Sequence, residues 1–425
     1  MLSTLNFKEL SFLVYGLGLS GQSVVKFLKK KKIKKFEVWD DKQKKLFKNK
    51  RTKNLNKALN NVDFIVLSPG ISFIEKKNLI KFEKKIITDI DFLFLTNKNF
   101  KSIVVTGTNG KSTTCKLISH LLKKNKIEVL IGGNIGTPIL DLKIKKNSYV
   151  VIEASSFQLS HSKFIRPDYA ILLNITNDHL DWHGNMSNYI NSKLKIFALQ
   201  KKNQFSLVNK KLKKIFKKRD FVSRLVTPKQ ENYKKIKYKI KNNYLKLSVN
   251  DENMSFVYTF SKLLKISNKN FIAAINSFVG LSHRYEVFLK KKNIIFINDS
   301  KATSFESTKL ALSNSKNVYW ILGGLPKKND KIVLSGVRKN IIKSYLIGKN
   351  IEFFKKQIQN KISCSVTNNL KRTLIEILKD IKLSRLKDNI ILLSPAAASY
   401  DQFINFAKRG EEFKKLSKFY ARKFI

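Results

Sequence analysis

The segment Ser102-Ile-Val-Val-Thr-Gly-Thr-Asn-Gly-Lys-Ser-Thr113 decides the fold of the chain around it. Its apolar half is typical of a buried strand, and a helical pattern opens after the glycines. Such a turn presents backbone N–H groups to phosphate, while the lysine reaches the terminal phosphates and the next hydroxyl can bind magnesium. Val105 replaces the first glycine of the longer phosphate-loop pattern, so the match is to the shorter form at 107–112. The segment predicts a nucleotide-binding α/β unit; an ordinary glycine turn is the alternative.

A second glycine-rich turn lies near the amino terminus. Gly16-Leu-Gly-Leu-Ser-Gly21 follows the apolar run 12–15, and Asp40 ends the next apolar run, 36–39. This is the dinucleotide fingerprint, in which an acid follows about 20 residues on. The pattern fits a nicotinamide dehydrogenase, another nucleotide-diphosphate site built the same way, or a structural turn.

Short apolar runs alternate with helical segments along the chain, which predicts an α/β protein with parallel sheets. We expect three units, at residues 1–90, 91–280 and 281–425. Further strands are expected at 63–67, 149–152, 169–173, 294–297, 318–322 and 389–393. The lysine-rich stretch 201–250 has no clear pattern, and residues 270–279 predict a helix that ends at Gly280.

The formal charge of +55 has three possible meanings. Lysine and arginine neutralise nucleic-acid phosphates, and a basic field also attracts small anionic substrates. The third possibility is compositional drift. Because the lysines occur in every region and form no single stripe, we favour drift and expect no nucleic-acid partner.

The cysteines, the first residues and the apolar runs of the chain indicate the compartment in which the protein works. Cys115 and Cys364 are too far apart for a disulfide framework or a zinc pattern, so we expect small core residues in a reducing compartment. The first ten residues lack the pattern of a signal peptide, and no apolar run approaches the ~20 residues of a membrane helix. The sequence therefore predicts a cytoplasmic protein without a membrane span.

Polar residues follow the expected strands of the central unit. Glu153 ends the run 149–152, where an acid beside a phosphate loop can hold magnesium or can cap a helix. The segment 177–183 contains His179 and His183. Zinc is the obvious alternative there, but neither a cysteine nor a helical His-x-x-x-His accompanies the pair. We favour one histidine as a magnesium or substrate contact.

Three other features are less specific. Asn298-Asp-Ser-Lys-Ala-Thr303 and Ser394-Pro-Ala-Ala-Ala-Ser-Tyr-Asp-Gln-Phe403 each follow an expected strand. Ligands of open α/β sheets bind at the carboxyl ends of strands, although turn and cap chemistry would give the same residues. Lys193 lies in the expected helix 189–197, where pattern alone indicates one more surface lysine.

Together, these motifs resemble the Mur ligase family, and within it the members that add D-glutamate. The matching segments run in order along nearly the whole chain: 16–21, 107–112, 132–136, 153–159, 177–181, 189–197, 283–286, 298–303, 323–324 and 393–410. The resemblance implies a Rossmann-like N-terminal domain, a central mononucleotide-binding ATPase domain with a parallel sheet, and a Rossmann-like C-terminal domain. It also recasts the fingerprint at 16–40 as a site for UDP in place of NAD.

The resemblance further implies an activity. The protein would join D-glutamate to UDP-N-acetylmuramoyl-L-alanine through an acyl phosphate, using ATP and Mg²⁺, in peptidoglycan precursor synthesis. It would act as a cytoplasmic monomer. The competing hypotheses are an NAD-dependent oxidoreductase, based on residues 16–40, and a nucleic-acid-binding protein, based on charge.

Site residues are carried over by position. The catalytic residues implied are Lys111, His179 and Lys193. ATP contacts would be Gly107, Thr108, Asn109, Gly110, Lys111, Ser112, Thr113, Asn270, Arg284 and Asp299. UDP-substrate contacts would be Leu19, Ser20, Asp40, Ser68, Asn134, Gln158 and His179. Metal ligands would be Ser112, Glu153, His179 and a carbamylated Lys193. D-Glutamate contacts would be Lys301, Thr303, Lys327, Ser399, Tyr400 and Phe406. The loop 323–330 departs from the family pattern, so Lys328 could replace Lys327.

Overall fold

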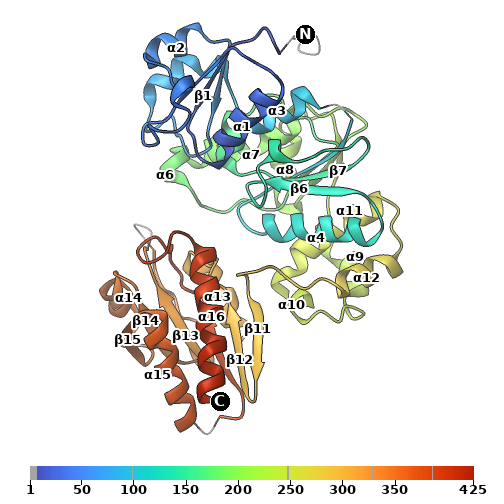
Figure 1. The fold of residues 1–425 in the computed structure, drawn as a ribbon. Helices are drawn as coiled ribbons and strands as arrows, with labels where there is room; N and C mark the ends of the chain where they lie inside the picture. The colour runs from blue at the N-terminus through green and yellow to red at the C-terminus, as the bar shows by residue number, and fades with distance from the viewer. Residues whose placement is uncertain (1–6, 98, 247, 327–329, 385) are drawn as a thin grey trace. The chain divides into compact units, whose positions relative to one another are not determined.

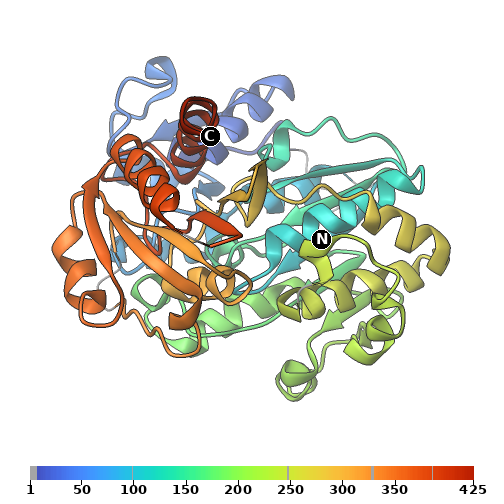
Figure 2. The ribbon, with the colours of Figure 1, turned by 90° about the horizontal axis from the view of Figure 1, so that it is seen from below.

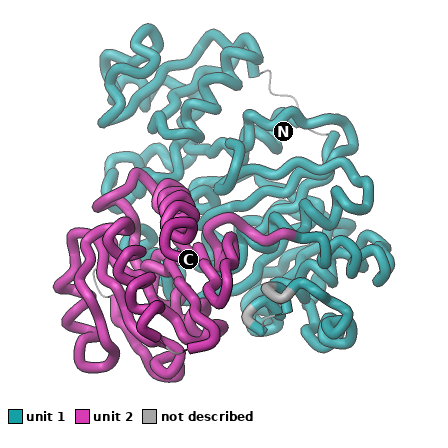
Figure 3. The backbone as a smooth tube through the Cα atoms, turned by 60° about the horizontal axis from the view of Figure 1, so that its bottom comes forward, with its two compact units in different colours: residues 1–278 teal, residues 279–425 magenta. Residues whose placement is uncertain are grey.

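The computed structural model describes residues 7–97, 99–246, 248–326, 330–384 and 386–425 (Figure 1). The chain divides into two compact units, Met1–Phe278 and Val279–Ile425 (Figure 3). In the described residues, unit 1 contains a four-stranded and a six-stranded sheet, and unit 2 contains a second six-stranded sheet. This is the α/β architecture with parallel sheets that the sequence predicts.

The four-stranded sheet of unit 1 has the order β2-β1-β3-β4, and all its strands are parallel. Its elements are β1 (Phe12–Tyr15), α1 (Leu19–Lys30), β2 (Phe36–Trp39), α2 (Leu55–Asn61), β3 (Phe64–Leu67), the 3₁₀ helix η3 (Lys77–Lys85) and β4 (Ile86–Ile87). β1 lies between β2 and β3, so the glycine-rich turn after Tyr15 meets the residues that follow β2 and β3 at one edge of the sheet.

The six-stranded sheet of unit 1 is also parallel, with the order β10-β9-β8-β5-β7-β6. Its strands are β5 (Lys101–Thr106), β6 (Val129–Gly133), β7 (Tyr149–Glu153), β8 (Tyr169–Leu172), β9 (Phe205–Val208) and β10 (Arg224–Val226). β5 is central because Ile103, Val104 and Val105 are apolar and fully buried. The phosphate loop follows β5, next to the carboxyl ends of β7 and β8.

Helices complete this part of unit 1. They are α3 (Asp89–Thr96), α4 (Lys111–Lys124), α5 (Ser156–His161), α6 (Leu180–His183), α7 (Met186–Ala198), α8 (Lys213–Lys217), α9 (Gln230–Lys237), α10 (Asn243–Lys246), α11 (Asp251–Leu263) and α12 (Asn268–Asn276). The expected helix end at Gly280 is wrong. α12 ends at Asn276, because the N–H groups of Ser277 and Phe278 turn back onto carbonyls of the last helical turn.

Unit 2 has the sheet order β11-β12-β16-β13-β14-β15, in which only the β11–β12 pair is antiparallel among the described strands. Its elements are β11 (Glu286–Lys291), β12 (Ile294–Asn298), α13 (Phe305–Ser313), β13 (Val318–Gly323), β14 (Ile341–Ile347), α14 (Ile351–Ile358), β15 (Cys364–Asn368), α15 (Leu370–Leu383), β16 (Asn389–Leu393) and α16 (Phe406–Phe424). Neighbouring β13 residues point to opposite faces, so Trp320 and Tyr319 belong to different core clusters. The C-terminal helix α16, dark red in Figure 2, packs against β11, β12 and α15.

The two cysteines differ in their burial. Cys115 is buried in α4, whereas Cys364 at the start of β15 is only partly buried; both are free thiols. Within the described ranges, no helix combines the length and the apolar character needed to cross a membrane.

Two glycines of the turn after β1 meet opposite steric conditions. A Cβ atom on Gly21 would lie 1.9 Å from the carbonyl oxygen of Gly16, because the start of α1 packs directly on the turn. A Cβ atom on Gly18 would meet no heavy atom within 4 Å. The close approach of α1 to β1 therefore requires glycine at position 21 and not at position 18.

We expect Gly21→Ala to lower the free energy of unfolding by about 1–3 kcal/mol, because the backbone carbonyl cannot move aside as a flexible side chain would. Gly18→Ala is the matched control and should change it by less than about 0.5 kcal/mol. Urea denaturation of both variants measures the difference. Equal stability of the two variants would contradict the packing described for α1.

Candidate functional site

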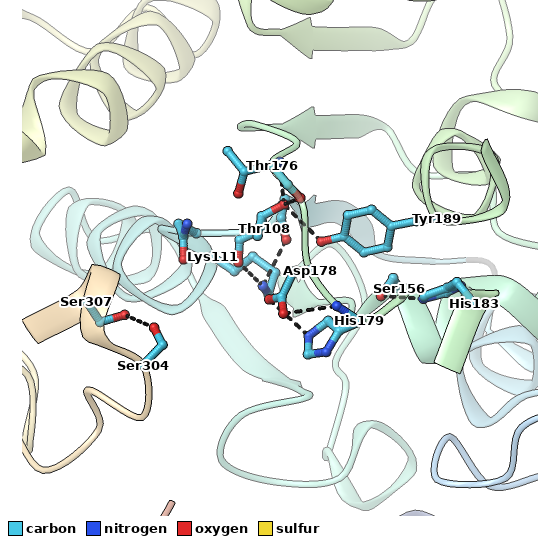
Figure 4. Close-up of polar contacts among 12 residues, drawn as sticks. Thr108, Lys111, Ser156, Thr176, Asp178, His179, His183, Tyr189, Ser304 and Ser307 are labelled. Carbon is cyan, nitrogen blue, oxygen red and sulfur yellow. Dashed lines mark hydrogen bonds and ion pairs between the residues drawn. The ribbon is translucent and has the colours of Figure 1, made fainter. Parts of the chain in front are cut away.

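The phosphate loop joins the end of β5 to the start of α4. Gly110 is the residue before the helix and has φ of +84°, a conformation that favours glycine. The Lys111 ammonium donates to the carbonyl oxygens of Gly107 and Thr108, each at 2.8 Å, so it lies over the loop (Figure 4). Ser112 and Thr113 are buried in the first turn of α4. The loop therefore has the strand–turn–helix arrangement that the sequence predicts.

Two neighbouring elements brace this loop. Asn174, which follows β8, accepts a hydrogen bond from the Asn109 N–H at 2.9 Å and donates to Glu252 at 2.7 Å. Asn253, in the first turn of α11, lies so close to the loop that a Cβ on Gly110 would be 2.2 Å from its carboxamide oxygen. Sequence analysis missed Asn253, because an asparagine in an Asn-rich, weakly patterned region carries no local signal. Asn270, by contrast, lies exposed in the first turn of α12.

Glu153 is the last residue of β7 and is opposite Val105 in the register of β5 and β7. Its side chain is buried, and its Oε1 accepts a hydrogen bond from the Asn134 amide at 3.0 Å. Its Oε2 is buried and has no hydrogen-bond partner in the described part of the chain. A buried carboxylate oxygen without a donor beside a phosphate loop fits a magnesium ion, which prefers such oxygen ligands.

The described residues contain no metal site made only of the usual ionisable ligands. In the described ranges, no three His, Cys, Asp or Glu side chains gather in a metal-binding arrangement. A cation beside Glu153 would therefore also need hydroxyl or phosphate oxygens, and Ser112 in the first turn of α4 carries a hydroxyl.

The reading of Lys193 as a surface lysine is wrong. Its side chain is only 1% exposed, because it lies on the inward face of α7 together with Tyr189, Ile196 and Phe197. Its Nζ donates to the Gly107 carbonyl at 2.9 Å and lies 4.5 Å from the centre of the Tyr189 ring. Burial lowers the pKa of Lys193 well below its usual value, and the Lys111 charge lowers it further. The structure thus places a readily deprotonated amine against the phosphate loop.

His179 begins the short helix α6 with φ of +56°, in the left-handed region. Its ring packs against Phe157 at 4.7 Å between centroids, and its Nε2 lies 3.4 Å from a carboxylate oxygen of Asp178. The same loop is tied to the phosphate loop, because the Thr176 N–H donates to the Thr108 hydroxyl (Figure 4). His179 remains partly exposed at 38%, so it is accessible to a ligand.

His183 differs from His179 in its surroundings. Its ring is buried, and its Nε2 lies 3.0 Å from the Ser156 hydroxyl (Figure 4). Burial lowers the pKa of His183 to about 4, and the nearby His179 and Lys193 charges act in the same direction. His183 is therefore neutral near pH 7 and joins α6 to α5. The two histidines therefore differ in exposure, and His179 is the more accessible of the two.

The residues expected at the uridine end gather around the turn after β1. Burial tends to raise the pKa of Asp40, but N–H groups of Gln43, Leu17 and Lys42 bond to its carboxylate and bring the pKa below its usual value. The Ser68 hydroxyl donates to the Gly16 carbonyl at 2.8 Å. Both side chains therefore hold the turn.

Three more residues are expected to contact the UDP-substrate. Leu19 and Ser20 lie at the start of α1, and Gln158 lies on α5. Leu19 is 78% exposed and Ser20 is half-buried. Gln158 is buried and forms a capping box with Ser155, whose backbone N–H it accepts at 3.1 Å. Leu19 is thus open to a ligand, while Gln158 mainly fixes the start of α5.

In unit 2, the expected residues follow β12 and β16. Asp299 is buried and accepts hydrogen bonds from the Ser394 hydroxyl and the Tyr285 N–H. Burial raises its pKa to about 7, against the opposing effects of these bonds and of the Arg284 charge. Lys301 lies 5.0 Å from the Phe406 ring centre.

The remaining D-glutamate candidates differ in exposure. Ser399 is buried, Thr303 is half-buried and Tyr400 is 71% exposed. Lys327 and Lys328 lie outside the described residues. Arg409, which lies in the matching segment 393–410, is buried and donates to the carbonyl of the last residue of β13 and to carbonyls that follow β12 and β16. It holds together the loops that carry these candidates.

These features define a multidomain phosphate-loop enzyme: parallel sheets, a phosphate loop, and a buried acid and a buried lysine beside that loop. Comparison with known proteins makes this class specific. The family model of the Mur ligase middle domain matches residues 105–278, and that of the MurD-like N-terminal domain matches residues 10–88. The chain belongs to the Mur ligase family.

Its relatives cover nearly the whole chain. The UDP-N-acetylmuramoylalanine–D-glutamate ligase of Rickettsia felis is 36% identical, with 95% of this chain and 96% of the relative covered. The ligase of the same name from Buchnera aphidicola subsp. Schizaphis graminum is 35% identical, with 97% and 99% covered. These relatives leave the alternative of a nicotinamide oxidoreductase without support.

Solved structures share the fold at low sequence identity. The UDP-N-acetylmuramate-alanine ligase MurC of Thermotoga maritima has a TM-score of 0.58 at 16% identity, covering 97% of this chain and 100% of that one. The MurF ligase of Thermotoga maritima, solved in complex with ADP, also has a TM-score of 0.58 at 16% identity, with 99% of each chain covered. The predicted fold class is confirmed.

The neutral, buried state of His183 predicts a pH dependence. Its pKa is about 4 in the folded protein and about 6.5 in the unfolded chain. As the pH falls from 6.5 to 4, the unfolded chain binds a proton that the folded protein does not, so stability is lost across this window. We expect His183→Gln to remove on the order of 1–2 kcal/mol of that loss. Unfolding free energies between pH 4.5 and 7.5 measure it.

Ser156→Ala is the control for this measurement. It removes the hydrogen bond but keeps the imidazole, so the pH dependence should persist. A His183→Gln variant with the same pH dependence as the parent protein would show that His183 does not titrate as described.

Proposed function

We propose that this protein joins D-glutamate to UDP-N-acetylmuramoyl-L-alanine, using ATP, in the synthesis of peptidoglycan precursors. The observation that carries the proposal is the similarity to curated D-glutamate ligases along about the whole chain, 95% for the Rickettsia felis relative. The phosphate loop with Lys193 buried against it supports the same chemistry. We also propose that the protein works in the cytoplasm as a monomer.

The division of labour that we propose has three domains, at residues 1–90, 91–280 and 281–425. The first would bind the UDP part of the substrate around the turn after β1, where Leu19 and Ser20 lie at the start of α1. Asp40 and Ser68 would act mainly by fixing the turn, since each already bonds to its backbone. Asn134, Gln158 and His179 would contact the muramoyl part.

The central domain would bind ATP. Backbone N–H groups of residues 107–113 and the Lys111 ammonium would hold the phosphates, with Asn270, Arg284 and Asp299 serving the rest of the nucleotide. Asn253 is a further candidate, because it already lies against Gly110. Ser112 and Glu153 would hold one magnesium ion, which neutralises phosphate charge during transfer. His179 and a carbamylated Lys193 would hold a second.

The reaction would proceed in two displacements. An oxygen of the L-alanine carboxylate attacks the γ-phosphorus of ATP, the bond to the β-phosphate oxygen breaks with its electron pair, and ADP leaves. The D-glutamate amine then attacks the acyl carbon, and the resulting tetrahedral species releases inorganic phosphate and a proton to give the amide. Because all the reacting species are anions, the protein contributes mainly positioning and charge neutralisation.

The C-terminal domain would bind D-glutamate. The candidate contacts follow β12 and β16, which end at the same edge of the sheet: Lys301, Thr303, Ser399, Tyr400 and Phe406. Lys301 supplies a positive charge for a carboxylate. Either Lys327 or Lys328 would supply another.

The proposal predicts which components the reaction needs. Phosphate release should require Mg²⁺, UDP-N-acetylmuramoyl-L-alanine and D-glutamate together, and Lys111→Ala should lower it at least a hundredfold, because the variant loses a charge beside the phosphates. A coupled phosphate assay measures both effects. Equal turnover with L-glutamate or with a diamino acid would contradict the assignment, as would an unaffected Lys111→Ala variant.

A sharper prediction concerns Lys193. Carbamate formation needs a neutral amine, and the lowered pKa of Lys193 favours that form. Lys193→Arg keeps the charge but cannot form the carbamate, so it should lose nearly all turnover. Lys195→Arg is the matched control, since Lys195 lies on the same helix and donates to the Ser160 carbonyl away from the phosphate loop. Steady-state turnover of the two variants measures the difference.

The carbamate can also be observed directly. Incubation with ¹³C-labelled bicarbonate should give a carbamate NMR signal in the parent protein and in Lys195→Arg, and none in Lys193→Arg. Wild-type turnover of Lys193→Arg would refute the proposed role of the carbamate.

A further inference from the structure

The short helix α6, which His179 precedes directly, is not stable by itself. It has only four residues, and a single helical turn loses more conformational entropy than its few hydrogen bonds offset. His179 also has φ of +56°, a sparsely populated conformation for a residue with a side chain. Such a conformation persists only where the surrounding structure fixes it. The position of His179 therefore depends on what packs against α6.

The loop that follows β3 connects the turn after β1 to α6. At the start of this loop, the Ser68 hydroxyl bonds to the Gly16 carbonyl in that turn. Further along, the hydroxyl of the buried Ser72 donates to the Trp182 carbonyl of α6 at 3.1 Å. The Ser72 oxygen also accepts the Ile74 N–H at 3.1 Å, so the loop itself sets the direction of this side chain. The four-stranded sheet thus holds the backbone of α6.

A second contact of the same loop fixes His161 on α5. Its Nε2 donates to the Ile71 carbonyl at 3.3 Å, and its ring lies 4.5 Å from the Phe73 ring. Burial lowers the pKa of His161 to about 4, so the ring is neutral near pH 7 and uses its one N–H in this bond. The Trp182 ring lies 5.5 Å from the His161 ring. His161 therefore gives Trp182 a fixed surface to pack on.

The side chain of Trp182 extends this constraint to His179. Its ring lies 4.9 Å from the Phe157 ring and 4.6 Å from the His183 ring. Phe157 in turn lies 4.7 Å from the His179 ring. The Trp182 Nε1 is buried and has no hydrogen-bond partner among the residues that the structure describes. Trp182 therefore acts on its neighbours by packing and not through its polar group.

We propose that Trp182 and Ser72 are positioning residues of the ligase reaction, which hold His179 in place for its ligand. The inference rests on the proposed role of His179 as a ligand of the second magnesium ion. Ser72 fixes the backbone of α6, and the Trp182 ring fixes the His179 imidazole through Phe157. Because Ser72 belongs to the loop that begins at Ser68, the N-terminal sheet would contribute to the metal site as well as to UDP binding.

The position of His179 can be followed by NMR of protein with ¹³C-labelled histidine, with His179→Gln to assign the signal. Without ligands, Ser72→Ala and Trp182→Ala should both shift this signal. Trp182→Phe should restore most of the parent position, because it keeps an aromatic ring and loses no hydrogen bond. Phe64→Leu is the matched control, since Phe64 is partly buried at the other end of β3, where it stacks on Phe12 at 6.1 Å. An unmoved signal in either alanine variant would overturn the proposal for that residue.

The consequence for the metal is measured as the midpoint of a Mg²⁺ titration in the presence of ATP, followed by the His179 signal and by phosphate release. Replacing a group that orients a metal ligand costs about 10–100-fold in metal affinity, so Trp182→Ala should raise the midpoint at least tenfold. Ser72→Ala loses one hydrogen bond and should raise it about two- to tenfold. Phe64→Leu should leave it unchanged. Loss of folded protein would lower turnover without moving the midpoint.

The other outcomes separate this proposal from the ligase assignment. An unchanged midpoint in both alanine variants would overturn the proposal even if the His179 signal moves, because the contacts would then be structural only. A parent His179 signal that does not respond to Mg²⁺ with ATP would overturn it as well. If the parent protein turns over no amino acid, the ligase assignment fails, whereas the midpoint from the His179 signal still decides whether Trp182 and Ser72 position His179.

Discussion

Two lysine ammonium groups converge on one carbonyl oxygen, that of Gly107, and the site is organised by this contact. Lys111 reaches it from the start of α4 at 2.8 Å, and Lys193 reaches it from α7 at 2.9 Å. Two positive charges at such short range destabilise each other, so one amine must give up its proton more readily. Burial makes Lys193 the amine that gives up its proton more readily, because Lys193 is buried between α7 and its neighbours while Lys111 stays half-buried.

The surrounding fold keeps this contact in place. α7 packs on α5, and its Tyr189 hydroxyl bonds to the Thr108 hydroxyl at 2.9 Å. Burial raises the pKa of Tyr189 to about 12, so this hydroxyl keeps its proton at neutral pH. Asn174 and Asn253 hold the other side of the loop. The loop is thus fixed from α7, from the turn after β8 and from α11, which are separated by long stretches of sequence.

The sequence predicted the parts of this site that depend on local pattern. The strands at 12–15, 36–39 and 389–393 have the bounds expected from their apolar runs, and the phosphate loop has the expected turn. It could not predict that Lys193 is buried, because that depends on how α7 packs, and one lysine among many carries no signal. The same holds for Asn253 and Arg409, whose partners come from distant segments. β14 and β15 were also not anticipated, since their runs are mixed with polar residues.

The outer strand β11 has a consequence for how the protein behaves at high concentration. β11 is the antiparallel edge of the sheet in unit 2; its register shifts between Val287 and Leu289, and it ends in Lys290 and Lys291. A regular, uncharged edge offers free N–H and C=O groups to a strand of another molecule, which is a common route to aggregation. The irregular register disrupts that template, and the lysines repel an equally basic second chain. This edge of the sheet is therefore poorly suited to intermolecular strand pairing.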